Sequence, residues 1–153
     1  MGTITRLDKV AIFSGKLSFL IPHEWVEEME GGDYLYHEPE TDSGWLRVSL
    51  ITFPYEEETP EQRLGRHFKG QNNVTIDPQT GNVVRFSEKD SEEEGTPIHL
   101  FYWMVANVVP PDMLREAVFS YTVLLDRMND ENTKATVKVL GELVSRADFS
   151  QRD

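Results

Sequence analysis

The stretch that decides the fold lies at residues 16–25 and reads KLSFLIPHEW. A period of two, typical of a half-buried strand, places three apolar side chains on one face: Leu17, Phe19 and Ile21. Pro22 ends this strand, because proline has no N–H to donate to a neighbouring strand. Trp25 follows three residues later and is expected to anchor the core. The stretch therefore predicts the start of a β-sheet, and it carries no chemistry of its own.

Further strand-like segments, separated by turn residues, extend from this stretch along the chain. In residues 44–53, GWLRVSLITF, alternate side chains are expected to line opposite faces, with Trp45 and Arg47 on the same face. Residues 97–109 are the most apolar run, as expected of a strand in the middle of a sheet that is covered on both faces. The remaining strands are predicted at residues 10–13, 33–38, 74–76, 83–87 and 114–125, and acidic loops at residues 27–30 and 88–95.

Two helices are indicated by their terminal residues. Thr59 is a suitable N-cap, Pro60 suits the first helical position, and Gly70 ends this helix in the middle of the chain. Asp130 begins a second helix that runs to about Arg146. Its apolar residues recur at helical spacing, so one face is expected to pack on the sheet: Val137, Leu140, Leu143, Val144 and Ala147.

The order of these elements predicts the fold class. Runs of strands with segregated helices are typical of an α+β domain. We expect a single domain over residues 1–153, with a mostly antiparallel sheet of about seven strands, a mid-chain helix and a C-terminal helix. Because the central strands are apolar on both sides, we expect a helix on each face, which makes an α/β/α sandwich. The alternative is a cystatin-like α+β sheet, but such a domain places its long helix early, and here the long helix comes last.

This order of elements resembles the PsbP-like superfamily, which includes the photosystem protein PsbP, the Ran-binding Mog proteins and bacterial DcrB-like proteins. The resemblance covers nearly the whole chain and rests on Ile21-Pro22-His23-Glu24-Trp25, Thr59-Pro60, residues 100–104 and 117–125, and Ser145 with Phe149. The family pattern usually has glycine before the tryptophan, where this chain has Glu24. The resemblance implies an α/β/α sandwich, a protein-binding or accessory role, and a place in the bacterial uncharacterised or DcrB-like branch. It implies no reaction, because the superfamily shares no catalytic site.

Charge and composition exclude several classes of function. The chain has 27 acidic and 15 basic residues, and its formal net charge of −12 produces a field that repels nucleic acid and anionic membranes. This charge favours a basic partner, although solubility alone also explains it. The absence of cysteine excludes disulfides and thiolate metal sites. Because the polar N-terminus lacks the apolar core of a signal peptide, we expect a cytoplasmic protein.

No sequence motif indicates catalysis, a metal or a cofactor. The chain lacks the nucleophile elbow, the phosphate-binding loop and the dinucleotide-binding glycine motif, and its four histidines are not at metal-ligand spacing. We therefore expect a protein that is not an enzyme and that holds no cofactor. The alternative is a small enzyme or ligand-binding domain with a cleft between sheet and helix. Titratable groups on apolar strands would then be the first suspects: His99, Tyr102 and Glu116.

The candidate partner-binding residues fall into two groups. An aromatic patch of the kind common in protein interfaces is predicted from four residues on neighbouring strands, unless a helix covers it: Tyr34, Tyr36, Trp45 and Arg47. An acidic loop that would dock basic residues of a partner contributes three more: Glu92, Glu93 and Glu94. We therefore expect a non-enzymatic protein-binding or accessory module, either an adaptor or chaperone, or an immunity protein that binds a basic partner. The sequence does not decide whether the chain forms a homodimer through the aromatic patch.

Overall fold

The computed structural model describes residues 6–39, 44–54, 74–110 and 113–149. The strands are β1 (Leu7–Ile12), β2 (Leu17–Pro22), β3 (Val26–Glu30), β4 (Asp33–His37), β5 (Trp45–Pro54), β6 (Val74–Ile76), β7 (Val83–Glu93), β8 (Thr96–Val109), β9 (Met113–Leu124) and β10 (Asp148–Phe149). The 3-10 helix η1 (Leu125–Arg127) and the helix α2 (Glu131–Ser145) lie between β9 and β10. Within the described ranges, no helix combines the length and the apolar character that a membrane crossing requires.

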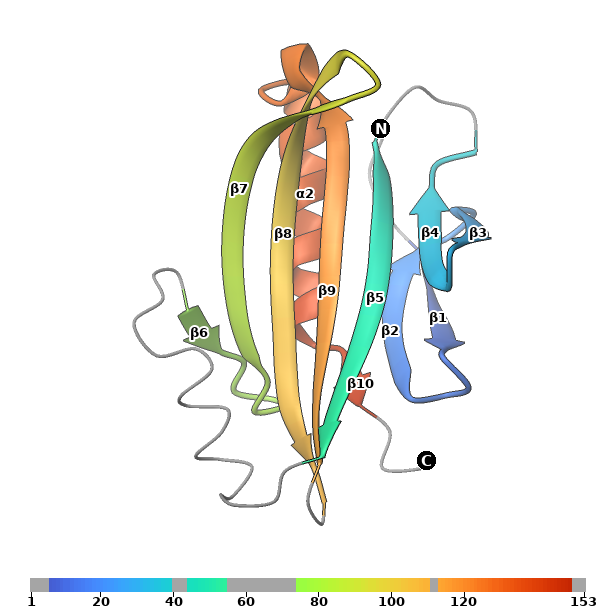
Figure 1. Cartoon of the computed structure of the whole chain (residues 1–153), viewed down its shortest axis with the longest axis vertical. Helices are drawn as coiled ribbons and strands as arrows, with labels where there is room; N and C mark the ends of the chain where they lie inside the picture. The colour runs from blue at the N-terminus through green and yellow to red at the C-terminus, as the bar shows by residue number, and fades with distance from the viewer. Residues whose placement is uncertain (1–5, 40–43, 55–73, 111–112, 150–153) are drawn as a thin grey trace.

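The strands form two antiparallel sheets (Figure 1). The large sheet has the order β3-β4-β5-β9-β8-β7-β6, and the small sheet has the order β1-β2-β10. The seven strands of the large sheet confirm the mostly antiparallel sheet that we predicted. The small sheet is a correction, because we expected β1 and β2 to belong to the same sheet as β5. The apolar side chains of β2 pack face to face on the large sheet instead of extending it.

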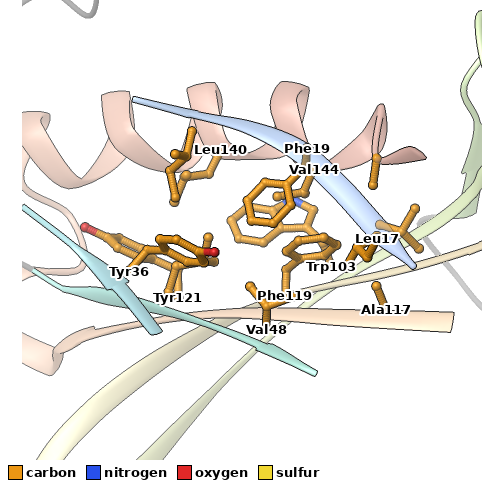
Figure 2. Packing of buried hydrophobic residues seen from close by; sticks show 14 of the residues in the cluster. Leu17, Phe19, Tyr36, Val48, Trp103, Ala117, Phe119, Tyr121, Leu140 and Val144 are labelled. Atoms are coloured by element: carbon orange, nitrogen blue, oxygen red, sulfur yellow. The ribbon is translucent and has the colours of Figure 1, made fainter. Parts of the chain in front are cut away.

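The core lies between the large sheet and a second layer that consists of α2 and the small sheet (Figure 2). We call the sheet face that this layer covers the inner face, and the opposite face the outer face. The ring of Phe19 on β2 meets the rings of Phe119 and Tyr36 edge to face, with centroids 5.2 and 5.7 Å apart. Leu140 and Val144 of α2 complete this packing and are buried. The alternation predicted for β2 is confirmed, because all three of its inward residues are buried: Leu17, Phe19 and Ile21.

The middle strand of the large sheet is β9, and β8, the run that we predicted to be central, lies next to it. β9, in the middle of the large sheet, buries Ala117 and Phe119 on the inner face and Leu114 on the outer face. Around Leu114 and Ala106, the outer face carries a second buried cluster. The predicted mid-chain helix lies outside the described residues, so the outer layer of the expected sandwich stays a prediction. The described residues thus form an α+β fold in which the predicted C-terminal helix, α2, covers the inner face.

Two acidic segments that we predicted as loops are strands. Residues 88–93 continue β7, which pairs with β8 residue by residue as far as Glu93 and Thr96. β3 forms one edge of the large sheet, and all five of its side chains are exposed. Little of either segment faces the core, so neither needs the alternation of apolar and polar residues by which a strand is recognised in a sequence.

Trp25 anchors the turn after β2, as predicted. Its ring stacks on Tyr121 of β9 with centroids 6.5 Å apart, and the backbone N–H of Trp25 donates to the carbonyl of Pro22 at 3.3 Å. The turn holds Glu24 at a φ of +74°, in the left-handed region where the Cβ of an L residue meets steric resistance. This conformation gives a physical reason for the glycine that the PsbP-like pattern has at this position.

We expect Glu24→Gly to raise the free energy of unfolding by about 1 kcal/mol, because glycine adopts a positive φ without steric penalty. The substitution loses only an exposed contact of 3.9 Å between Glu24 and His23, which contributes little. Urea unfolding measures the change, and Glu24→Ala is the control because it removes the carboxylate but keeps the Cβ. Equal stability of the two variants would show that the backbone conformation is not the cause.

Candidate protein-docking surface

The outer face of the large sheet carries two adjacent rows of paired side chains. One row crosses β5, β9 and β8 through Trp45, Thr122 and Leu100. The next row crosses the same strands through Arg47, Ser120 and Tyr102. Side chains of directly paired residues lie on the same face, so the two small residues of β9 separate larger ones on both sides. We call these six residues the docking face: Trp45, Arg47, Leu100, Tyr102, Ser120 and Thr122.

Trp45 of the docking face is exposed and its other large residues are partly exposed, whereas its centre is buried. Trp45 is 38% exposed, whereas Ser120 and Thr122 are 9% and 6% exposed. A hollow of about 280 Å³ lies beside Tyr102, lined also by Met104 and other outer-face residues of β7, β8 and β9. The Nζ of Lys89 lies 5.8 Å from the centre of the Tyr102 ring, within the range of a cation–π contact. An apolar surface with a polar rim of this kind is typical of a protein-binding site.

Ion pairs orient the polar side chains along the β3–β4 side of the docking face. Arg47 donates from Nη2 to Glu30 at 2.6 Å and from Nη1 to Asp33 at 3.0 Å. The pKa of Arg47 is raised, mainly by the hydrogen bond to Glu30. Burial acts in the opposite direction, and the hydrogen bond to Asp33 adds to the effect of Glu30. Beside this group, the Nε2 of His37 pairs with Glu28. This side of the docking face is therefore an ordered array of charges in which carboxylates outnumber cations.

The structure divides the aromatic patch that we predicted. Tyr34 and Tyr36 pair with the inward-facing residues of β5, so both tyrosines lie on the inner face. Tyr36 is 1% exposed and its hydroxyl donates to Glu27 at 2.7 Å. Burial, and secondly Glu27, raise the pKa of Tyr36. The tyrosines thus belong to the core, and only Trp45 and Arg47 of the predicted patch face outward.

The predicted acidic residues Glu92, Glu93 and Glu94 lie at the tip of the β7–β8 hairpin, where all three are exposed. Glu94 has a φ of +50° in the turn that joins the two strands. The tip extends past the end of the pairing between β8 and β9, and so it is not part of the docking face (Figure 1). The role of these glutamates as a partner contact stays a prediction.

Sequence reasoning missed three residues of the docking face, namely Leu100, Ser120 and Thr122. A signal was present, because Ser120 and Thr122 are small polar residues two apart in the otherwise apolar run of residues 117–124. Such spacing marks the less deeply buried face of a strand. Tyr102, which we considered only as a catalytic suspect, is the tyrosine that shares the outer face with Trp45.

The three suspects of the enzyme alternative do not converge. His99 lies on the inner face, whereas Tyr102 and Glu116 lie on the outer face. The row of paired residues that contains Met104 and Val118 lies between the rows of Tyr102 and Glu116. Among the residues that the structure describes, no three histidine, aspartate or glutamate side chains are placed to hold a metal ion. These three residues therefore form no shared catalytic site.

His99 is held between two carboxylates on the inner face. Its Nδ1 lies 2.6 Å from Asp90 and its Nε2 lies 2.9 Å from Glu88, while the ring packs against Phe101. A neutral imidazole has a single N–H, so hydrogen bonds to two carboxylates require the protonated ring. Burial lowers the pKa of His99, but the hydrogen bonds and charges of Asp90 and Glu88 more than offset this effect, and the pKa is raised.

We expect His99 to contribute less stability as the pH rises. Its pKa in the folded protein lies above the value of about 6.5 in the unfolded chain. Its contribution is therefore fully present below about pH 6.5 and is lost as the pH rises through the folded pKa. Urea unfolding between about pH 6 and pH 9 should show a smaller fall in the free energy of unfolding for His99→Gln than for the unchanged protein.

His37 supplies the comparison for this experiment. Its pKa is also raised, first by the hydrogen bond to the carbonyl of Glu38 and then by Glu28, against a smaller effect of burial. His37→Gln should therefore reduce the pH dependence in the same direction, and the two substitutions together should reduce it further. A His99→Gln protein with unchanged pH dependence would show that the carboxylate pair does not stabilise the imidazolium.

Comparison with known proteins shows the fold of this chain and no family. No family model and no curated protein matches the chain. Solved structures do match: the Ran-binding protein Mog1p of Saccharomyces cerevisiae is similar with a TM-score of 0.54 and 11% identity, over 94% of this chain and 95% of that one. LpqN of Mycobacterium tuberculosis, which is involved in cell envelope biogenesis, is similar with a TM-score of 0.55 and 10% identity, over 95% of this chain and 91% of that one.

A protein of Bacteroides thetaiotaomicron is similar with a TM-score of 0.58 and 19% identity over 93% of this chain. This chain spans only 48% of that protein's length. At such identities the likeness concerns the fold alone. It shows that this chain shares the fold of Mog1p, a protein of the Mog group that the sequence resemblance named, whereas the full α/β/α sandwich stays a prediction.

Proposed function

We propose that this chain is a non-enzymatic protein-binding or accessory module that engages its partner through the docking face. The observation that carries the proposal is the half-exposed Trp45 on the same face as Tyr102, with the buried Ser120 and Thr122 between them. Tryptophan, tyrosine and arginine are the residues most enriched among those that dominate binding energy, and the docking face, with Arg47, holds one of each. The similar fold of Mog1p, a Ran-binding protein, supports a role in protein binding and names no partner for this chain.

The partner that we propose is a protein with a basic surface. The carboxylate side chains of Glu28 and Glu30 beside the docking face are 58% and 66% exposed. The hairpin tip adds residues 92–94, and the net charge of −12 would speed association with a basic protein. An adaptor or chaperone suits this chemistry, and so does an immunity protein that covers a basic toxin. A single domain over residues 1–153, a cytoplasmic location and a place in the bacterial DcrB-like branch belong to the same proposal.

Trp45→Ala tests the docking face. The tagged protein is used to capture its partner from the native lysate at low salt, and the affinity of the isolated partner is then measured. We expect Trp45→Ala to weaken binding about 30-fold, because a central tryptophan contributes about 2 kcal/mol. Leu20→Ala is the matched control, since Leu20 is 41% exposed on the small sheet and Trp45 is 38% exposed.

Three results would contradict parts of the proposal in different ways. A Trp45→Ala protein that binds as tightly as the Leu20→Ala control would exclude the docking face as the contact. Binding that is unaffected by about 0.5 M salt would exclude the basic partner, because exposed charges are screened at that concentration. A dimer of the protein alone that dissociates in Trp45→Ala would replace the foreign partner with a second copy of the chain.

A further inference from the structure

A groove on the other side of the large sheet runs between α2 and the β6–β7 edge. Its volume is about 650 Å³, within the range of about 300–1,000 Å³ that small-molecule sites occupy. The floor is apolar and is built from the sheet residues Val84, Phe86 and Trp103 together with Val137 of α2. The charged residues of its lining are Asp77, Lys138, Glu142 and Arg146. The described residues that line the docking face take no part in this groove.

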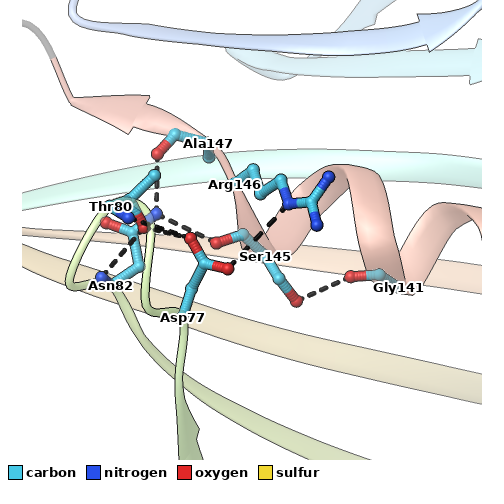
Figure 3. Close-up of polar contacts among 7 residues, drawn as sticks. All are labelled: Asp77, Thr80, Asn82, Gly141, Ser145, Arg146 and Ala147. Atoms are coloured by element: carbon cyan, nitrogen blue, oxygen red, sulfur yellow. Dashed lines mark hydrogen bonds and ion pairs between the residues drawn. The ribbon is translucent and has the colours of Figure 1, made fainter.

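One end of the groove is closed by polar contacts between the β6–β7 turn and the end of α2 (Figure 3). Asp77 accepts hydrogen bonds from the backbone and the hydroxyl of Thr80 at 3.0 and 2.7 Å, and Arg146 approaches it at 3.9 Å. Asn82 donates to the carbonyls of Ser145 and Ala147. These contacts engage the carboxylate of Asp77, so Lys138, Glu142 and the exposed guanidinium of Arg146 are the charges left to meet a ligand.

Gly141 opens the middle of α2 above the indole ring of Trp103. Glycine inside a helix is less stable than alanine by about 1 kcal/mol, so its place in α2 indicates a requirement for space. A Cβ at Gly141 would lie 3.1 Å from the Nε1 of Trp103. The nitrogen edge of the indole therefore faces the gap that the missing side chain leaves in the wall of the groove.

The Nε1–H of Trp103 has no hydrogen-bond acceptor among the described residues. Trp103 is 4% exposed, and its ring packs against Phe86, at 5.5 Å between centroids. The Nε1 is not among the buried side-chain atoms that lack a partner in the described part of the chain, so it is accessible from the groove. An acceptor oxygen that a ligand brought into the groove would satisfy this donor.

We propose that the groove binds an amphipathic organic carboxylate, a small molecule with an apolar body and one carboxylate group. The apolar body lies on Phe86 and Val137. The carboxylate accepts a hydrogen bond from the Nε1–H of Trp103 and pairs with the ammonium group of Lys138. Glu142, one turn further along α2, opposes the negative charge of the ligand. This site is independent of the docking face and of the function proposed for it.

The resonance of the Trp103 indole N–H in a two-dimensional ¹H–¹⁵N NMR spectrum reports on this site, and decanoate serves as the probe. The signal is assigned by its absence in Trp103→Phe. Decanoate, kept below its micelle concentration, should move the signal downfield in a saturable manner, and decanol should bind about tenfold more weakly because it lacks the charge. A Trp103 signal that does not move with decanoate would overturn the proposal. Equal affinities for decanol and decanoate would show that the site does not recognise the carboxylate group.

Variants on α2 locate the binding. Lys138→Met should weaken decanoate binding about tenfold, whereas Lys134→Met, which removes an exposed lysine one turn earlier, should leave it unchanged. Gly141→Ala should weaken binding at least about tenfold by filling the gap beside the indole, and Glu142→Gln should strengthen it a few-fold. Equal affinities of the unchanged protein and Lys138→Met would overturn the proposal even if Gly141→Ala failed to fold.

Discussion

Gly44→Ala is expected to lower the free energy of unfolding by about 4 kcal/mol, because the added methyl group would overlap the central strand. A Cβ at Gly44 would lie 2.3 Å from the carbonyl oxygen of Thr122 and 2.8 Å from the Cγ1 of Val123. Side chains can turn away from a new methyl group, but the carbonyl of Thr122 belongs to β9, which is paired on both sides. The overlap is therefore relieved only if the start of β5 separates from β9.

Urea unfolding followed by tryptophan fluorescence measures this loss, and Gly31→Ala is the matched control. Gly31 has a φ of +60° and open space where alanine would add its methyl group, so alanine there should lower stability by only about 1 kcal/mol through backbone strain. A loss for Gly44→Ala no larger than that for Gly31→Ala would mean that β5 and β9 move apart easily. Because Trp45 is the next residue, the same displacement would also disturb the docking face.

The faces of single strands could be predicted from the sequence, but the relation between strands could not. The alternation within β5 correctly separates Trp45 from Leu46, because successive side chains of a strand point to opposite faces. Whether Tyr34 and Tyr36 share a face with Trp45 depends on the register of β4 against β5. A shift of one residue in that register moves every side chain of a strand to the other face, and no local pattern determines it here.

The candidate sites could not be predicted either, because each depends on how separate elements of the chain are placed against one another. Asp90 and Glu88 meet His99 because β7 pairs with β8 along the whole of β7, whereas we expected an acidic loop from residue 88 onward. The groove combines residues of α2 with residues of β6, β7 and β8, which only the packed structure brings together. The core was easier to predict, since apolar periodicity in β2 and α2 reflects burial directly.

Asn82→Ala is expected to lower the free energy of unfolding by about 3 kcal/mol, because each buried group left unpaired lowers stability by about 1–3 kcal/mol. Asn82 is 1% exposed, and its side-chain amide donates to the carbonyls of Ser145 at 3.1 Å and Ala147 at 2.7 Å. Its side-chain oxygen accepts from Asn107 at 2.8 Å. One side chain thus joins β7, β8 and the end of α2, and the methyl group of alanine replaces none of these contacts.

Asn82→Asp separates the loss of hydrogen bonds from the loss of volume. Aspartate has nearly the same shape, but at neutral pH it sets a carboxylate against the carbonyls of Ser145 and Ala147, so we expect it to be at least as destabilising as alanine. Protonation restores one donor, and the difference between Asn82→Asp and Asn82→Ala should therefore shrink as the pH falls. If both variants unfolded within about 0.5 kcal/mol of the unchanged protein, the end of α2 would be held by apolar packing alone, and the closed end of the groove would not depend on Asn82.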